Sequence, residues 1–354
     1  MTNPAEAHRA AADGAGAGDD RVLPFRTVKS GAQGRLVRLG ASADGILTRH
    51  GYPDAVSQVL GEALALASLL GSLLPAQGKG PRSSSATAGG GRLILQTKTD
   101  GPLRQLVVNY TVPGDLRGLA TFDAAAIEAA VGEGRGDAAS LLGNGHLAMT
   151  IDPGGEGPRT QGIVALDGNT LAEAAYTYFR QSEQIPTFVR LAVARHQVRP
   201  APGLPPVWRW RAGGLLVQQL PEDAIQRAGK SASDPRSAVT AADSDDDEVR
   251  AAYEEDWNRA RMLASTVEDH EMLDPTLTAE ELLYRLFAEE GVRVLDDVPV
   301  AAHCGCTRDR VERLLRTFGA DELVDMREDD GGISVKCEYC STEHRFSADE
   351  VSRL

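Results

Sequence analysis

Cysteine is missing from the first 303 residues of this 354-residue chain. The four cysteines all follow that point, at Cys304, Cys306, Cys337 and Cys340. Their absence elsewhere excludes a disulfide framework across most of the chain. In a reducing compartment, thiols that cluster in this way indicate a metal site before they indicate disulfides.

Positive charge, long apolar runs and a targeting segment are also lacking. The chain has 37 basic against 51 acidic side chains, and a net charge of −14 argues against a nucleic-acid binder held by phosphate contacts. The longest apolar run, near 60–76, is shorter than the ~20 residues that a bilayer requires. Residues 1–20 lack the basic start and apolar stretch of a signal peptide. We therefore expect a cytoplasmic protein with no membrane and no nucleic-acid partner.

Aromatic residues are scarce at 5%, whereas glycine and proline occur at ordinary levels, with 37 and 18 residues. This composition excludes a collagen-like chain and a wholly disordered one. A hydrophobic content of 42% over this length allows at least one domain to bury a core and fold unaided.

The expected fold class is α+β, with a mixed sheet-and-helix N-terminal domain over residues 21–228 after a solvated tail at 1–20. A helix with an apolar face begins at Gly51-Tyr52-Pro53. Thr170 and Glu173 have capping-box spacing and predict a helix over 171–183. Alternating apolar patterns predict strands over 93–99, 106–110, 146–151, 162–166, 187–194 and 215–220.

Residues 229–290 form an expected acidic helical linker. Its first part, 229–242, is short of apolar residues, as is the loop over 77–91, and neither builds a core. Two amphipathic helices follow, and the second opens with a capping box at Thr278 and Glu281. Because such helices make no core of their own, we expect their apolar faces to dock on the mixed domain.

The cysteines have the pattern C-x-C-x30-C-x-x-C. Four thiolates in two close pairs suit tetrahedral zinc, with Zn–S distances near ~2.3 Å and no open position for a substrate. We therefore expect one Zn²⁺ per chain and a small zinc-binding module over 291–354, with helices capped by Thr307 and Ser347. A purely structural metal is the simplest interpretation. However, each pair is close enough in sequence to oxidise within itself, and a module this short is marginal without its metal.

Several segments resemble the heat shock protein 33 family, the redox-regulated holdase chaperones. The likeness runs from about Asp20 to the C-terminus and includes the order of its segments. These are 51–53, 143–145, 178–187, 212–216, 283–290, 304–311 and 337–340. The loop over 77–91, the spacer over 229–247 and His344 depart from the family pattern.

The resemblance implies a stress-response chaperone that acts without ATP, is idle while reduced and zinc-bound, and is not an enzyme. Oxidation would form redox-active disulfides between Cys304 and Cys306 and between Cys337 and Cys340. Zinc release and linker unfolding would then let the N-terminal domain, as a homodimer, hold unfolding client proteins. Candidate client-binding residues in the linker, which are equally suited to docking in the folded state, are Tyr253, Trp257, Leu263, Leu286 and Phe287.

The alternative is a zinc-ribbon protein-interaction module whose metal is purely structural. An enzyme finds little support, because His270-Glu271 lacks the second histidine of a zinc protease motif. The charge is also unevenly distributed. Residues 243–290 carry −12 and residues 291–354 carry −5, whereas 1–242 carry +3. As a hypothesis, repulsion among the linker carboxylates keeps its helices close to undocking.

Overall fold

The computed structural model describes residues 19–75, 90–154, 157–199, 203–219 and 247–353. The expected loop over 77–91 and spacer over 229–242 lie almost wholly outside these residues. Asp19 and Asp20, which the sequence placed in a solvated tail, lie against the domain: Asp19 forms a buried ion pair with Arg211.

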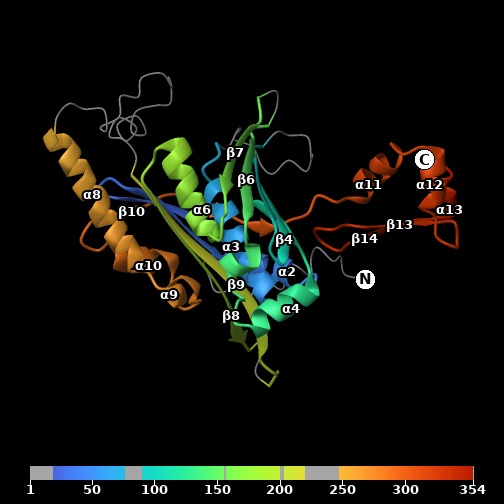
Figure 1. Cartoon of the computed structure of the whole chain (residues 1–354), viewed down its shortest axis with the longest axis horizontal. Helices are drawn as coiled ribbons and strands as arrows, with labels where there is room; N and C mark the ends of the chain where they lie inside the picture. Colours follow the sequence, from blue (N-terminus) through green and yellow to red (C-terminus); the bar gives the residue numbers. More distant parts are fainter. Residues whose placement is uncertain (1–18, 76–89, 155–156, 200–202, 220–246, 354) are drawn as a thin grey trace.

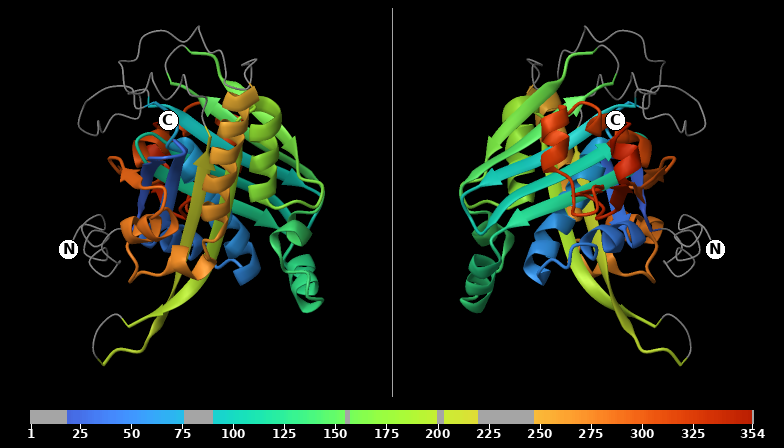
Figure 2. Two further views of the ribbon diagram at one scale, coloured as in Figure 1. Left: turned by 90° about the vertical axis from the view of Figure 1, so that its left-hand side faces the viewer. Right: turned by 90° about the vertical axis from the view of Figure 1, so that its right-hand side faces the viewer.

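Two sheets form the N-terminal domain (Figure 1). The first has strand order β10-β1-β2-β9-β8, with β11 also paired to β1, and its pairs are antiparallel. Its strands are β1 (Arg21–Thr27), β2 (Gln33–Leu39), β8 (Thr187–Val198), β9 (Val207–Gln218), β10 (Val292–Val294) and β11 (Val298–Pro299). The β8–β9 hairpin extends well beyond the rest of the domain (Figure 2).

The second sheet has strand order β12-β5-β4-β3-β6-β7 and is antiparallel except where β12 joins β5. Its strands are β3 (Arg92–Thr99), β4 (Leu103–Thr111), β5 (Asp115–Phe122), β6 (Gly145–Asp152), β7 (Thr160–Ala165) and β12 (Ala301–Ala302). The C-terminal segment therefore contributes strands to both sheets, through β10 and β11 in the first and β12 in the second.

Helix α3 (Asp54–Gly71) lies between the two sheets and contacts strands of both. Fourteen of its 18 residues are buried, so burial extends beyond the single apolar face that the sequence predicted. The helix ends at Gly71. A Cβ atom at this position would overlap the ring of Tyr110. By length and composition alone α3 is apolar enough to cross a bilayer, but 78% of that stretch is buried inside the protein, as in the core helix of a folded domain.

Shorter helices complete the domain. They are α2 (Ala41–Leu47), α4 (Ala124–Gly132), α5 (Ala138–Leu142), α6 (Leu171–Tyr178) and the π-helical turn η2 (Phe179–Glu183). The predicted capping box at Thr170 is formed, but the α-helix expected over 171–183 ends at Tyr178 and continues as the π-helical turn.

The linker helices α8 (Asp247–Ser265), α9 (Asp269–Leu273) and α10 (Ala279–Leu286) lie along one side of the molecule, away from the C-terminal module (Figure 1). Side chains alternate between the faces of a strand, so β2 sends Val37 to the core around α3 and Leu36 to the opposite face. The linker helices pack on that opposite face. Their expected docking on the mixed domain is therefore confirmed.

The C-terminal module consists of α11 (Arg308–Leu315), α12 (Ala320–Asp325), β13 (Ile333–Lys336), β14 (Glu343–Phe346) and α13 (Ala348–Val351). Its own core has only six buried apolar side chains, Val311, Leu315, Leu323, Ile333, Phe346 and Val351. Such a core is small for independent stability. The α+β class is confirmed, and so are the caps at Thr278, Thr307 and Ser347.

Some boundaries differ from expectation. Strands β8 and β9 are each 12 residues long and extend well past the ranges expected from their apolar runs. Helix α9 and strands β10 to β12 were not predicted, because short segments carry too little periodicity. Helix α11 stops at Leu315, and α12 follows it as a separate helix that the sequence analysis did not predict.

Candidate metal centre

The four thiols come from two turns of the C-terminal module. Cys304 and Cys306 lie between β12 and α11, and Cys337 and Cys340 lie in the turn between β13 and β14. This second turn, residues 337–341, is called the knuckle below. The Cys337 amide donates to the Thr342 carbonyl at 2.9 Å, and the Ser341 amide donates to the Cys337 carbonyl at 2.8 Å. These bonds close the knuckle, so that both of its thiols face the first turn.

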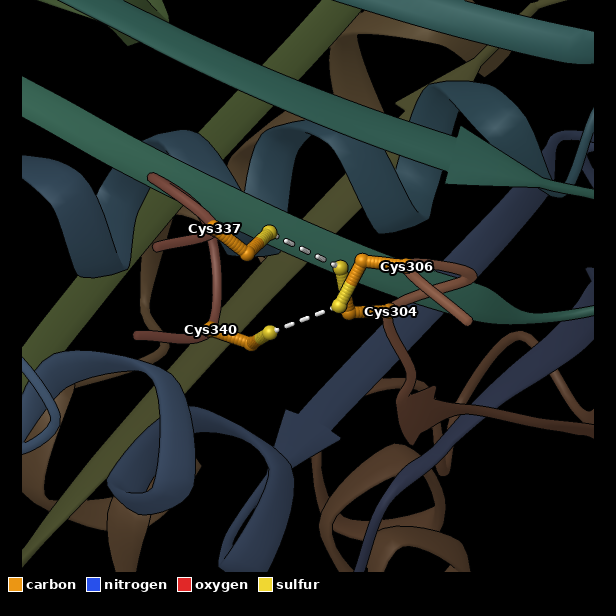
Figure 3. Close-up of side chains that lie close together, drawn as sticks. All are labelled: Cys304, Cys306, Cys337 and Cys340. Carbon is orange, nitrogen blue, oxygen red and sulfur yellow. Dashed lines mark hydrogen bonds between the residues drawn. The ribbon is translucent and has the colours of Figure 1, made fainter. Parts of the chain in front are cut away.

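The four sulfur atoms lie within 4.8 Å of one another (Figure 3). Cys304 Sγ is 3.7 Å from Cys337 Sγ, and Cys306 Sγ is 3.1 Å from Cys340 Sγ. Sulfur ligands at ~2.3 Å from one zinc ion occupy tetrahedron corners about 3.8 Å apart. Among the described residues, no other group of three or more histidine, cysteine or acidic side chains gathers in this way. Both the donors and their spacing fit one metal ion.

Burial and mutual hydrogen bonds shift the pKa values of the thiols in different directions. Burial raises the pKa of Cys306 far above its usual range, and hydrogen bonding to Cys340 adds to the effect. Burial also raises the pKa of Cys337. For Cys340, burial acts upward, but hydrogen bonds from Thr342 and Cys306 outweigh it and lower the pKa to about 6. Four thiolates at this separation repel one another, so a cation is needed before all four ionise together.

The linker interface is the apolar contact between α8–α10 and the first sheet. The sheet contributes Leu23, Phe25, Ala32, Leu36, Ala192, Leu215 and Val217. The linker contributes Ala260, Ala264, Val267, Met272, Leu273, Leu277, Ala279, Leu282, Leu283, Leu286 and Phe287. Phe287 is fully buried, and its ring lies 5.3 Å from that of Phe25. The docked linker therefore covers an apolar sheet face.

All five linker residues singled out from the sequence lie at this interface. Leu286 and Phe287 belong to the buried cluster, and Trp257 and Leu263 pack against it. The Tyr253 hydroxyl donates to the Gln219 carbonyl at 3.0 Å. In this conformation the side chains serve docking, and undocking would expose them.

Polar side chains also hold the linker. Arg38 of β2 is 3% exposed and donates to three backbone carbonyls between α9 and α10, those of Met272, Asp274 and Leu277. Glu290, at the end of the linker, accepts a hydrogen bond from the Ser30 amide at 2.9 Å. The sequence analysis missed Arg38, because an arginine in a strand carries no sign of a buried partner.

The knuckle contacts the N-terminal domain through three side chains that the sequence analysis also missed. Asn109 of β4 donates to the Tyr339 hydroxyl at 3.0 Å, and Arg117 of β5 lies over the Tyr339 ring, 4.2 Å from its centroid. His50, between α2 and α3, lies 3.3 Å from the Tyr339 carbonyl. These residues are more than 200 positions from the knuckle, and local sequence patterns do not report such contacts.

Comparison with known proteins identifies the family. A model described as Hsp33 protein matches residues 20–347. The chain is 41% identical to the "33 kDa chaperonin" of Caulobacter vibrioides over 93% of this chain and 95% of that protein. It is 34% identical to the "33 kDa chaperonin" of Nitrosococcus oceani over 95% and 94%.

The fold agrees with this relationship. The crystal structure of a 33 kDa chaperonin, a heat shock protein 33 homolog from Thermotoga maritima, matches with a TM-score of 0.66 and 22% identity, covering 94% of this chain and 97% of that one. At that identity the likeness concerns the fold alone. Together with the family match and the 41% identical relative, it leads to one conclusion: the chain belongs to the Hsp33 family of chaperones.

Proposed function

We propose that this chain is a cytoplasmic, ATP-independent holdase whose activity is switched on by oxidation of its four cysteines. Membership of a chaperone family implies binding of unfolded client proteins. The proposal adds the switch. The reduced protein, with one Zn²⁺ held by the four thiolates, is inactive, and the oxidised protein protects unfolding clients from aggregation.

One observation carries the proposal: the thiol cluster lies in the segment that directly follows a linker docked over an apolar sheet face. The linker packs over the cluster that contains the sheet side chains Phe25, Leu36 and Leu215. A covered apolar face becomes a binding surface for unfolded chains when its cover leaves. The thiols follow that cover closely along the chain, which suits them to control it.

The donor set favours zinc. Soft thiolate ligands in a tetrahedral arrangement select Zn²⁺ or iron–sulfur chemistry over hard cations such as Mg²⁺ and Ca²⁺. When bound, zinc would supply structural organisation alone, because four protein ligands leave no open position for substrate. The chain's part is to bring Cys304, Cys306, Cys337 and Cys340 together, and the small apolar core beside them adds little to that.

The oxidation balances with peroxide as the oxidant. Two thiolates, one hydrogen peroxide and two protons give one disulfide and two waters, and a second such step consumes the remaining thiolates. Four thiolate ligands are lost in this way. The free energy that metal binding contributed to folding the module, about 10–16 kcal/mol in zinc-finger peptides, is lost with them.

The proposed pairs are Cys304 with Cys306 and Cys337 with Cys340. In the reduced arrangement, sulfurs of opposite turns approach one another to 3.1 and 3.7 Å, so the alternative cross-pairs are sterically within reach. The two outcomes differ physically. Cross-pairs would keep the turns stapled together and preserve the module, whereas pairs within each turn leave the turns unconnected. Only the latter explains unfolding on oxidation.

Loss of the module would then free the linker. The proposal continues with undocking of α8–α10, formation of a homodimer and binding of clients by the exposed apolar surface. The linker residues Tyr253, Trp257, Leu263, Leu286 and Phe287 are proposed to join that surface, since undocking exposes them together with the sheet side chains.

The test is zinc content, free-thiol count and light scattering by a heat-labile client, all measured during treatment with peroxide at mildly raised temperature. We expect zinc release, loss of four thiols and suppressed scattering to coincide. Protein reduced again with dithiothreitol and Zn²⁺ is the control, and it should lose the activity. Zinc release with unchanged scattering would mean that the metal is purely structural and that the module is an interaction domain.

Peptide mapping of the oxidised protein tests the pairing. We expect disulfide-linked peptides that contain both cysteines of one turn. Dominant Cys304–Cys337 or Cys306–Cys340 bridges would contradict the proposed mechanism, because such bridges hold the module together.

A further inference from the structure

Three side chains of the N-terminal domain, His50, Asn109 and Arg117, form a surface that we call the knuckle dock. We propose that the knuckle dock holds the C-terminal module on the second sheet while the thiols are reduced, and that it lets go when they are oxidised. This inference rests on the proposed redox function and names residues outside the thiol cluster that position it.

Tyr339 is the residue that the dock grips. It lies between the two cysteines of the knuckle, so its position depends on how Cys337 and Cys340 are held. Asn109 donates to its hydroxyl at 3.0 Å, and the Arg117 guanidinium covers its ring at 4.2 Å from the centroid. A cation over an aromatic face contributes attraction in addition to the contact area. The side chain is therefore held at both its ring and its polar end.

His50 fixes the knuckle backbone. Its Nε2 lies 3.3 Å from the Tyr339 carbonyl, and its Nδ1 lies 3.2 Å from the Ser341 hydroxyl. A carbonyl only accepts, so Nε2 must donate, and neutral Nδ1 accepts from the hydroxyl. One histidine tautomer satisfies both contacts. The backbone of Ser341 has a positive φ of 56°. Its hydroxyl reaches His50 only while the knuckle keeps this backbone conformation.

Arg117 also faces the thiol cluster. Its guanidinium lies 4.0 Å from Cys304 Sγ, and within the described parts of the chain it forms no ion pair with a carboxylate. Four thiolates with one divalent cation carry a charge of about −2, which a guanidinium at this distance stabilises. Arg117 thereby links the charge of the cluster to the grip on Tyr339.

Oxidation removes both the negative charge of the thiol cluster and the knuckle conformation that places Tyr339 in the dock. Each disulfide consumes two thiolates, one hydrogen peroxide and two protons and yields two waters. Once both disulfides have formed and the zinc has left, the cluster no longer carries the charge of about −2 that faces Arg117 through Cys304. The two sulfurs of the knuckle must also approach to about 2.05 Å, which is far closer than metal ligands stand. The residues between Cys337 and Cys340, including Tyr339, must then rearrange. The dock loses its shaped partner when the knuckle pair is oxidised, and it loses its charge partner when Cys304 and Cys306 are oxidised as well.

Asn109 offers a built-in reporter of the dock. It lies on the outer face of the second sheet, yet it is only 5% exposed, and Tyr339 is its hydrogen-bonded partner. Release of the knuckle should therefore expose a residue in the middle of β4 without disturbing the strand. Hydrogen exchange of the knuckle and covalent labelling around Asn109 both follow the dock independently of any client.

The decisive variants are Arg117→Gln and Tyr339→Phe, measured in the reduced, zinc-loaded full-length protein. We expect Arg117→Gln to raise the rate of zinc release at fixed peroxide roughly tenfold and to remove hydrogen-exchange protection from residues 337–342. In a glutathione buffer its thiols should oxidise under more reducing conditions, because the reduced cluster loses a stabilising cation. Tyr339→Phe keeps the ring and loses only the bond from Asn109, so it should show a smaller change in the same direction.

Arg117→Lys and Arg104→Gln are the controls. The first keeps the positive charge without the planar stacking and should restore the oxidation midpoint but not the full exchange protection. The second removes a half-exposed arginine of β4 that pairs with Asp123, and it should change neither property.

The readouts separate this inference from the proposed function. They need only reduced protein, zinc and peroxide, with no client. If Arg117→Gln and Tyr339→Phe both leave zinc release and exchange protection unchanged while peroxide still activates the chaperone, the dock is wrong and the function stands. If the variants behave as expected but no oxidised form protects a client, the dock stands and the function fails.

Discussion

Two interfaces hold the C-terminal part of this chain on its N-terminal domain, and they differ in chemistry. At the linker interface, eleven buried apolar residues of the linker lie against the first sheet. At the knuckle dock, one tyrosine is held by an amide and a guanidinium of the second sheet and by the imidazole of His50 from the α2–α3 connection. Apolar burial is large and non-directional, whereas polar contacts are smaller and fail when geometry changes.

The difference suggests a division of labour. A contact that depends on the geometry of four thiols responds to oxidation, and a contact made of aliphatic area does not. Under the proposed mechanism, the linker interface is therefore released indirectly, after the module has unfolded. Its charge of −12 helps here, since carboxylates crowded on docked helices repel one another.

Loss of the metal is expected to have the largest effect, because it should remove one of the two interfaces completely. Chelation of the metal from reduced protein, or the change Cys340→Ser, should unfold residues 304–353 because the six-residue core of the module cannot hold it. Hydrogen exchange should report full loss of protection there and no loss in α3. A module that stays protected without metal would show that its apolar core is sufficient.

Truncation at the centre of the linker interface has the next largest expected effect. Phe287→Ala should lower the stability of the docked linker by about 3–5 kcal/mol, because it removes a fully buried aromatic ring. Denaturant titration followed by hydrogen exchange over 247–290 would measure it. Tyr284→Ala, one turn earlier and 67% exposed, is the matched control and should change little.

Arg38 tests whether polar contacts matter at the apolar interface. Arg38→Met keeps much of the apolar stem but leaves three carbonyls of the α9–α10 connection without their donor, at a cost of about 2–3 kcal/mol. Faster exchange over 269–278 in the reduced protein would reveal the loss. Arg26→Met on β1 serves as the control. Equal exchange in both variants would show that the hydrogen bonds of Arg38 do not stabilise the docked linker.

Glu62 of α3 tests the core that lies between the two interfaces. Burial, with a smaller contribution from Asp269 of the docked α9, raises its pKa to about 7. The folded protein therefore holds this proton more tightly than the unfolded chain, so stability falls as pH rises from the ordinary pKa through about 7. Glu62→Gln should stabilise the protein by about 2–3 kcal/mol at pH 8 and by almost nothing at pH 4. Thermal melts across that range would decide, and a pH-independent difference would contradict the assignment.

The sequence predicted those features that have a local cause. The capping boxes at Thr170 and Thr278 need only side chains three residues apart, and both are formed. The gathering of the four cysteines was predicted, because their spacing alone restricts their chemistry. The docking of the linker followed from amphipathic helices that had nothing else to cover.

The remaining features depend on contacts between distant segments. Arg38 meets the linker 234 residues later, and Asn109 meets Tyr339 across 230 residues. Neither side chain differs in its local pattern from an exposed polar residue of a strand. Strands β10 to β12 have two or three residues each and exist because the edges of two sheets accept them.

Strand β12 also fixes the length of chain between the second sheet and the thiol cluster. Ala302 pairs with Leu116 of β5, the His303 amide donates to the Leu116 carbonyl at 3.0 Å, and Cys304 comes next in the chain. A residue spans at most about 3.6 Å, so the first thiol turn has almost no slack. Any larger displacement of that turn must pull β12 from the sheet. The mechanical coupling between the thiol cluster and the N-terminal domain is thus set by chain length at one point.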